Sequence, residues 1–464
     1  MKKNTQLFTI ILCLLLVNFS NAQTISGGGS HALSVCDNNT VSSWGWNGFG
    51  QLGNGTNTNS NIPVQVTSLT GITAVAGGYH HSLALKNDST VWVWGRNNWG
   101  QLGDGTNNDS NIPIQLTSLT GVVAIATGAY HNIILKNDGT LWSWGFNFDG
   151  QLGNGNNADS NIPVQVSGIT DIAAIAAGEY QSIILKNDGT VWTFGNNYFG
   201  QLGNATNVAS NVPVQVTLLS GIIAVAGEGA HSLALKNDST VWSFGGNVAG
   251  ELGNGTNANS NIPVQVNALT NITAIAGGYS HSLALRNDNT VWAWGSNPYG
   301  ELGNGTNTSS NVPVQVSSLT DIIAIGGGNT YSIALKNDGT IRTWGENNYG
   351  TLGNGTIINS NIALQPTGLC PVSLSTIETM DATLISISPN PASADIKIEL
   401  TGFSHAADAL TITDVHGRII YSVGINAADV SKMIDISKFN NGIYFLNVMS
   451  NKVVLNSAKF IKSN

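Results

Sequence analysis

Histidines recur at a fixed spacing and are the first candidates for chemistry in this sequence. Imidazole is a common metal ligand and general base, so such a series could indicate a metal or catalytic centre. Five of the eight histidines share one position of a fifty-residue grid: His31, His81, His131, His231 and His281. The same position holds Gln181 and Tyr331 in the other copies. Residues spread around repeated units cannot converge on one ion, so we predict that these side chains satisfy buried backbone groups.

Sequence motifs of the common enzyme classes are absent. The chain has no HExxH, CxxC, GxSxG or GxxxxGK[ST] segment, which are the signatures of many hydrolases, redox proteins and nucleotide-binding proteins. Asn-Asp-Gly turns such as Asn137–Gly139 supply one carboxylate each, too few for the six to eight oxygens that calcium prefers. The sequence therefore predicts a protein that is not an enzyme, with no catalytic residue, no metal and no cofactor.

The fifty-residue repeat must position these residues. QLGNG and close variants begin at Gln51, Gln101, Gln151, Gln201, Glu251, Glu301 and Thr351, seven copies without an insertion. Within the second copy, residues 72–78, 81–86 and 90–95 are short β-branched and aromatic runs, as are residues 62–66 just before it. Four short strands per copy, separated by turn residues, form a meander. The sequence predicts an all-β chain in which seven meanders close a seven-bladed β-propeller.

The repeat resembles that of the regulator of chromosome condensation family. Its pattern A-G-x-x-H-S-L-A-L-x-x-D-G-x-V-x-x-W-G-x-N-x-x-G-Q-L-G recurs in all seven copies over about residues 24–370. The resemblance implies a seven-bladed propeller. Members of the family include a nucleotide exchange factor for a nuclear GTPase, plant ultraviolet-B photoreceptors and a bacterial β-lactamase inhibitor, so the fold implies little about function.

Two tryptophan series follow the same grid. They comprise Trp92, Trp142, Trp192, Trp242 and Trp292, and Trp44, Trp94, Trp144, Trp294 and Trp344. We predict that they pack between blades. The photoreceptors of the family pair such tryptophans with many arginines, whereas these repeats contain only Arg96, Arg286 and Arg342. A light sensor is therefore not expected.

The start of the chain predicts export. Lys2 and Lys3 precede an apolar run over residues 7–17, and small residues lead to a cleavage point after Ala22, so residues 1–22 are expected to be a signal peptide. No segment reaches the roughly 20 apolar residues of a transmembrane span. Residues 23–370 contain 8 Lys/Arg against 18 Asp/Glu. Because nucleic-acid binding needs clustered cations, no nucleic-acid partner is expected.

The end of the chain resembles the C-terminal sorting domain of the type IX secretion system. The resemblance rests on residues 388–400, 412–422, 434–448 and 458–462, which occur in the family's order. It implies a small C-terminal β-sandwich over residues 384–464, after a linker over residues 371–383, that engages the type IX secretion machinery. The propeller, residues 23–370, would then be secreted or displayed on the outer-membrane cell surface.

A disulfide is expected between the two cysteines that remain after signal-peptide removal. Cys36 occupies the repeat position of Lys86, and Cys370 that of Thr70 one full circuit later. Lys86 should lie nearly opposite Thr70 or its neighbours across the first hairpin of a blade. The bridge would therefore lock the last blade to the first.

Variation among the copies indicates a ligand-binding face. The second and fourth turns of each repeat are monotonous, whereas the first and third carry aromatic residues. These turns should emerge on one side of the ring, and exposed aromatic residues are typical of interfaces. The predicted ligand-binding residues are Trp46, Phe49, Tyr79, Arg96, Trp99, Tyr130, Phe146, Phe148, Tyr180, Tyr198, Phe199, Tyr279, Tyr299 and Tyr349.

The sequence favours a binding module that recognises a protein or glycan through this face. A secreted, hydrolase-like enzyme with its site at the central opening is the alternative, and guanine nucleotide exchange is a second one that rests on the family name.

Overall fold

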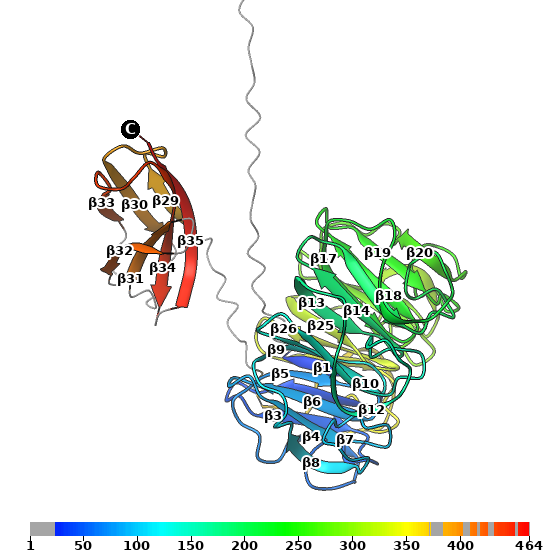
Figure 1. The fold of residues 1–464 in the computed structure, drawn as a ribbon. Coiled ribbons are helices and arrows are strands. Elements are labelled where there is room, and N and C mark those ends of the chain that lie inside the picture. Colours follow the sequence, from blue (N-terminus) through cyan, green and yellow to red (C-terminus); the bar gives the residue numbers. More distant parts are fainter. Residues whose placement is uncertain are drawn as a thin grey trace, which may run out of the picture. The chain divides into compact units, whose positions relative to one another are not determined.

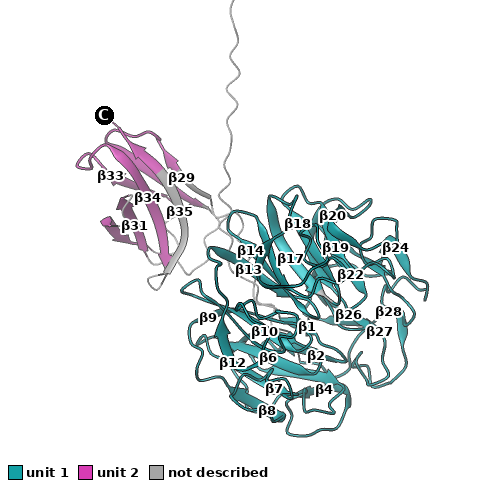
Figure 2. Cartoon of the chain, turned by 45° about the vertical axis from the view of Figure 1, so that its right-hand side comes forward, with its two compact units in different colours: residues 1–374 teal, residues 375–464 magenta. Residues whose placement is uncertain are grey.

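The computed structural model describes residues 24–370, 372, 384–401, 409–414, 418–425, 431–450 and 453–463. The chain divides into two compact units, residues 1–374 and 375–464 (Figure 2). The expected signal peptide lies outside the described residues, as does the expected linker apart from Val372.

Unit 1 consists of seven four-stranded antiparallel sheets, which confirms the predicted propeller. Strands follow one another within each blade in chain order. The blades are β1–β4 (Ile25–Gly27, His31–Val35, Val41–Gly45, Ser60–Gln65), β5–β8 (Ile72–Gly77, His81–Lys86, Val91–Gly95, Ser110–Gln115), β9–β12 (Val122–Thr127, His131–Lys136, Leu141–Gly145, Ser160–Gln165), β13–β16 (Ile172–Ala177, Gln181–Lys186, Val191–Gly195, Ser210–Gln215), β17–β20 (Ile222–Glu228, His231–Lys236, Val241–Gly245, Ser260–Gln265), β21–β24 (Ile272–Gly277, His281–Arg286, Val291–Gly295, Ser310–Gln315) and β25–β28 (Ile322–Gly327, Tyr331–Lys336, Ile341–Gly345, Ser360–Leu364).

The first strand of each blade lies innermost. Strands β1, β5, β9, β13, β17, β21 and β25 contact one another in this order, and β25 contacts β1, so the ring is closed (Figure 1). The second strands are buried along most of their length, whereas the fourth strands are half-exposed. The hydrophobic core therefore lies between neighbouring blades, where each sheet face meets the next.

Tryptophan side chains lock neighbouring blades together, as predicted. Trp94 is fully buried, and its indole N–H donates to the carbonyl oxygen of Gln51, in the preceding blade, at 2.8 Å. The same bond joins Trp44 in the first blade to Thr351 in the last, also at 2.8 Å. Each tryptophan thus stabilises the contact between two blades, because its large ring is buried there and its N–H satisfies a buried carbonyl group.

A buried asparagine holds the long third loop of each blade. The side-chain oxygen of Asn47 accepts from the amide of Leu52 at 2.9 Å, and its amide group donates to the carbonyl oxygens of Thr56 and Thr58. Equivalent bonds form at Asn97, Asn147, Asn197, Asn247, Asn297 and Asn347. The loop backbone is thus fixed, and the variable side chains beside it are presented on a rigid base.

The disulfide between Cys36 and Cys370 is present and closes the ring. Lys86 pairs with Ile72 in the second blade, and at the equivalent place Cys36 pairs with Val372. The chain after the seventh blade therefore returns to the first blade beside its innermost strand. This is the register from which the bridge was predicted.

Unit 2 is a small β-sandwich, which confirms the expectation for the tail. One sheet has the order β29-β30-β33 (Leu384–Ser388, Asp395–Thr401, Ser431–Asp435), and the other has the order β32-β31-β34-β35 (Ile419–Gly424, Ala409–Asp414, Gly442–Ser450, Val453–Lys462). Ile396, Ile434, Leu410 and Leu446, two from each sheet, are buried in one hydrophobic cluster. Across the described parts of the chain, no helix has the length and apolar character of a membrane span.

Candidate functional site: an aromatic face of the propeller

The first and third turns of each blade lie on the same side of the ring. The amide of Trp46, which opens a third loop, donates to the carbonyl oxygen of Ser30 in the first turn at 2.8 Å. Arg96 and His80 make the same contact in the second blade. We call this side, residues 28–30 and 46–59 with their equivalents at fifty-residue intervals, the loop face. The opposite side, formed by the second and fourth turns, is the turn face.

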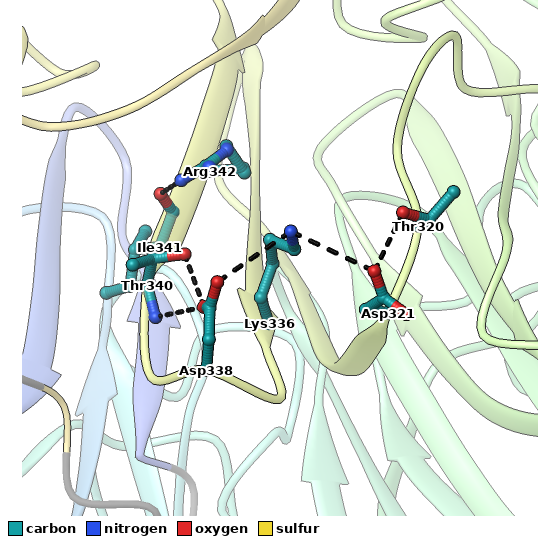
Figure 3. A network of polar contacts seen from close by, with 7 residues as sticks. All are labelled: Thr320, Asp321, Lys336, Asp338, Thr340, Ile341 and Arg342. Atoms are coloured by element: carbon teal, nitrogen blue, oxygen red, sulfur yellow. Dashed lines mark hydrogen bonds and ion pairs between the residues drawn. The ribbon is translucent and has the colours of Figure 1, made fainter.

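Many charges on the turn face are paired with a neighbour in the same turn or the adjacent one. Lys336 lies 3.8 Å from Asp338 in the second turn and 4.0 Å from Asp321 in the fourth (Figure 3). Asp338 also accepts from the Thr340 hydroxyl at 2.6 Å, and this bond, with that of the Thr340 amide, lowers the pKa of its carboxyl group. The contact between the Thr hydroxyl and the Asp carboxylate recurs at Asp88, Asp138, Asp188, Asp238 and Asp288. These acids shape turns and offer little to a ligand.

The loop face carries a continuous series of aromatic rings. Each member contacts at least one other ring of the series, with centroids 4.5–6.4 Å apart. The members are Tyr349, Trp46, Phe49, His80, Tyr79, Tyr130, Trp99, Phe146, Phe148 and Tyr180, and we call them the aromatic arc. They come from five consecutive blades, the seventh followed by the first to the fourth. Nine of the predicted ligand-binding residues are thereby brought together with His80, which the prediction omitted.

Arg96 is built into the aromatic arc. Its guanidinium carbon lies 4.6 Å from the centroid of Phe49 and 5.9 Å from that of Tyr130, both distances typical of cation–π contact. Phe148, Tyr349 and Trp99 remain 69%, 44% and 38% exposed. The arc is therefore partly self-packed and partly free to contact a ligand.

A carboxylate lies among the tyrosines of the first turns. The Glu179 carboxylate lies near the hydroxyl groups of Tyr180 and Tyr279. Burial raises the pKa of its carboxyl group, and the two nearby hydroxyl groups act in the opposite direction. Burial and this carboxylate raise the pKa of Tyr279 to about 12. Sequence reasoning missed Glu179, although the variation among first turns in which it stands was the available signal.

Four predicted residues lie outside the aromatic arc. Tyr279 is connected to it through Glu179. Tyr198, Phe199 and Tyr299 are exposed on the third loops of the fourth and sixth blades, and no ring contact joins them to the arc within residues 24–370.

The periodic histidines are buried between blades. His31 Nε2 lies 2.8 Å from the Ser82 hydroxyl in the next blade, and Ser82 donates its proton to the carbonyl oxygen of Gln51. The histidine must therefore be the donor, in its neutral form with the proton on Nε2. Burial lowers the pKa to about 3 in His31, His131 and His281, and to about 4 in His81 and His231. The described residues contain no group of three or more His, Cys, Asp or Glu side chains arranged for a metal ion.

Comparisons with known proteins agree with this architecture. Residues 38–85, 88–135 and 138–185 match the regulator of chromosome condensation (RCC1) repeat, residues 170–394 match the RCC1-like domain, and residues 386–463 match the secretion system C-terminal sorting domain. No curated protein matches the chain.

Similar solved structures include yeast RCC1 (Prp20) bound to Kap60, with a TM-score of 0.64 and 22% identity over 70% of this chain and 83% of that one. Another is human WBSCR16, with a TM-score of 0.63 and 23% identity over 70% of this chain and 92% of that one. At such identity these structures show the fold alone.

The sorting domain directs export through the type IX secretion system to the cell surface or beyond. The chain is therefore an exported β-propeller that contains regulator of chromosome condensation (RCC1) repeats and an RCC1-like domain, followed by a secretion system C-terminal sorting domain.

Proposed function

We propose that the protein is a non-enzymatic binding module whose loop face recognises a protein or glycan outside the cell. The observation that carries this proposal is the aromatic arc. Large exposed rings on a rigid base offer apolar contact area at low entropic cost, and such clusters are typical of binding hot spots. The turn face, whose acids are engaged in their own turns, has no comparable feature in the described residues.

Exposed aromatic residues inside and outside the aromatic arc can be replaced separately, which gives a matched experiment. Trp99, Phe148 and Tyr349 belong to the arc, and Tyr198, Phe199 and Tyr299 are comparably exposed outside it. The mature protein is immobilised, and capture from surface extracts and on a glycan array is compared for two triple alanine variants. The arc variant should lose capture, and the second variant should keep it.

Both variants should unfold at nearly the wild-type temperature, because the replaced side chains are exposed. The proposal fails if the arc variant captures its partner normally, or if capture is lost only when turn-face residues such as Asp138 and Asp338 are replaced by asparagine.

A further inference from the structure

Backbone hydrogen bonds join the first turns of most neighbouring blades around the propeller axis. The amide of Glu179 donates to the carbonyl oxygen of Gly229 in the next blade at 2.9 Å, and the amide of Tyr79 donates to that of Ala129 at 3.1 Å. The residues at this position are Gly29, Tyr79, Ala129, Glu179, Gly229, Tyr279 and Asn329. Large and small side chains thus alternate around the axis, except that Tyr279 and Asn329 are neighbours.

The small residues let side chains from non-adjacent blades meet. Glu179 belongs to the fourth blade and Tyr279 to the sixth, and Gly229 of the fifth blade stands between them. A Cβ atom on Gly229 would overlap the backbone of Tyr279, so only glycine leaves room for this approach. Across the first blade, where Gly29 stands, Asn329 donates to the Tyr79 hydroxyl at 3.3 Å. The result is a carboxylate with phenol groups from several blades around it.

Four tyrosines lie close enough to Glu179 for its negative charge to raise the pKa of their hydroxyl groups. Its carboxylate lies near the hydroxyl groups of Tyr180 and Tyr279 and interacts electrostatically with Tyr79 and Tyr130. The rings of Tyr79, Tyr130 and Tyr180 follow one another with centroids 5.8 and 6.2 Å apart. We call Glu179 and these four tyrosines the tyrosine–carboxylate cluster. The negative faces of aromatic rings beside a carboxylate are the combination that binds ammonium groups.

The distribution of charge also favours a cation on this face. Six of the eight Lys and Arg residues of the propeller end the second strands, beside the turn face: Lys86, Lys136, Lys186, Lys236, Arg286 and Lys336. Arg342 lies on β27 and donates to the carbonyl oxygen of Ile341. Among the described residues of the propeller, Arg96 is thus the only cationic side chain on the loop face. The acids of this face include Asp104, Asp109, Asp149, Asp159, Glu179, Glu251, Glu301 and Glu346. A face with this excess of acids attracts cations and repels anions.

Arg96 shows that aromatic rings of this face already bind a cationic group. Its guanidinium already occupies the cation–π position between Phe49 and Tyr130. Within residues 24–370, no lysine or arginine lies over Tyr180 or Tyr279. The part of the cluster nearest Glu179 thus has the same kind of rings, a negative charge and no cation of its own.

We propose that the tyrosine–carboxylate cluster binds an ammonium group of the ligand. This inference rests on the proposed function and deepens it by naming the chemistry of the ligand. The Glu179 carboxylate accepts hydrogen bonds from the ammonium, and the neighbouring tyrosine side chains contact its remaining sides. Two sources offer this group: a lysine side chain of a protein partner, and an amino sugar of a glycan.

The test uses the mature protein and two matched pairs of probes. Chitosan tetraose carries free amino groups, whereas chitotetraose carries neutral acetamides; acetyl-Gly-Lys-Gly-amide is compared with its neutral norleucine analogue. Titration calorimetry should show binding of at least one cationic probe and much weaker binding of its neutral counterpart. The pair that shows the difference identifies the source.

Glu179→Gln should weaken binding of the cationic probe by about tenfold or more, because hydrogen bonds to a charged group contribute about 1.5–3 kcal/mol. Asp109→Asn is the matched control, since it removes one negative charge from the same face at a position that is asparagine in Asn59, Asn259 and Asn359. That variant should change binding by less than about twofold, as expected for a screened, distant charge.

Equal binding of cationic and neutral probes, or unchanged binding by Glu179→Gln, overturns the ammonium site. If binding is then still lost in the Trp99, Phe148 and Tyr349 alanine variant, the loop face remains the binding face and only the ligand chemistry is wrong. Failure of both cationic probes to bind at millimolar concentration also overturns the ammonium site, and the capture experiment decides separately on the proposed function.

Discussion

The buried histidines show how one residue can tie two blades together at the cost of acid sensitivity. Each ring donates through Nε2, and Nδ1 of His31, His81, His131 and His281 is buried without a partner. Protonation would place a charge at that unpartnered nitrogen. The folded state therefore disfavours the imidazolium form strongly.

We predict that the propeller loses stability as the pH falls below about 6.5. The pKa of each histidine is lower in the folded state, at about 3 or 4, than in the unfolded chain, so unfolding takes up protons in this interval. Each histidine should remove about 1.4 kcal/mol of unfolding free energy per pH unit between about pH 6.5 and pH 4, with no effect above pH 7. Urea unfolding across this range measures the slope.

His131→Gln tests the assignment, because the fourth blade already carries Gln181 at this position, and its side-chain amide donates to the carbonyl oxygen of His231. The variant should reduce the slope by the contribution of one histidine. An unchanged slope would show that another group controls the acid response.

Sequence periodicity predicted the residues that pack the blades better than the residues around Glu179. The structural roles of the histidines and tryptophans were predictable because a residue that recurs in most blades serves what all blades share, which is packing. The predicted partner of the histidines was wrong, because His31 bonds to the Ser82 side chain of the next blade and not to a backbone group. The contact between Glu179 and Tyr279 has no such periodicity. It joins blades that are not neighbours and depends on the absence of a side chain at Gly229, so it could not be inferred from either residue alone.

At the scale of elements, the outer strands reveal how the ring protects its edges. The fourth strand of each blade has an unpaired edge, and six of the seven carry proline one residue after an exposed Ile or Val: Pro63, Pro113, Pro163, Pro213, Pro263 and Pro313. Proline has no N–H to offer to another strand, so it discourages association between edges. The seventh blade has Ala363 here, beside exposed Ile357, Ile358 and Ile362.

We predict that Ala363→Pro stabilises the protein and reduces its self-association. Six equivalent strands accept proline, so the backbone of β28 should accept it without strain. The gain should be about 0.4–1 kcal/mol in unfolding free energy, through lower entropy of the unfolded chain. Urea unfolding and light scattering measure the two effects. Pro63→Ala is the matched control and should act in the opposite direction; a loss of stability in Ala363→Pro would contradict the prediction.

The strands themselves were predictable to within one or two residues. Residues 72–78, 81–86 and 90–95 were expected as strands, and Ile72–Gly77, His81–Lys86 and Val91–Gly95 are observed. Short β-branched runs between Gly and Asn-Asp turns leave few alternatives. The third loops could not be predicted in shape, because their conformation depends on bonds such as those of Asn47, which connect residues up to twelve positions apart.

At the scale of the whole molecule, closure of the ring depends on its two ends. Removing the bridge with Cys36→Ser and Cys370→Ser should lower the unfolding free energy by about 2–5 kcal/mol, because the bridge joins residues 334 positions apart and restricts the unfolded chain. Urea unfolding of the double variant and of the reduced wild type should give matching losses. Equal stability of oxidised and reduced protein would refute a stabilising role for the bridge.

The sorting domain should be dispensable for folding and necessary for export. Its hydrophobic cluster is drawn from residues of its own unit, so deletion of residues 382–464 removes no core residue of the propeller. The truncated protein should accumulate in the periplasm, folded and with its disulfide formed. Cell fractionation locates it, and normal export of the truncation would contradict the prediction.

The position of the bridge also determines how the propeller responds to a pull from its tail. Strand β28 pairs with β27 at only two positions, Thr343 with Leu364 and Gly345 with Ser360. A force applied to the chain beyond Cys370 passes through the disulfide into Cys36, which follows directly on β2 of the first blade, before it can reach that weak outer pair. Tension on the sorting domain is therefore borne by a covalent bond and the interior of the ring, and the seventh blade is spared from being peeled off strand by strand.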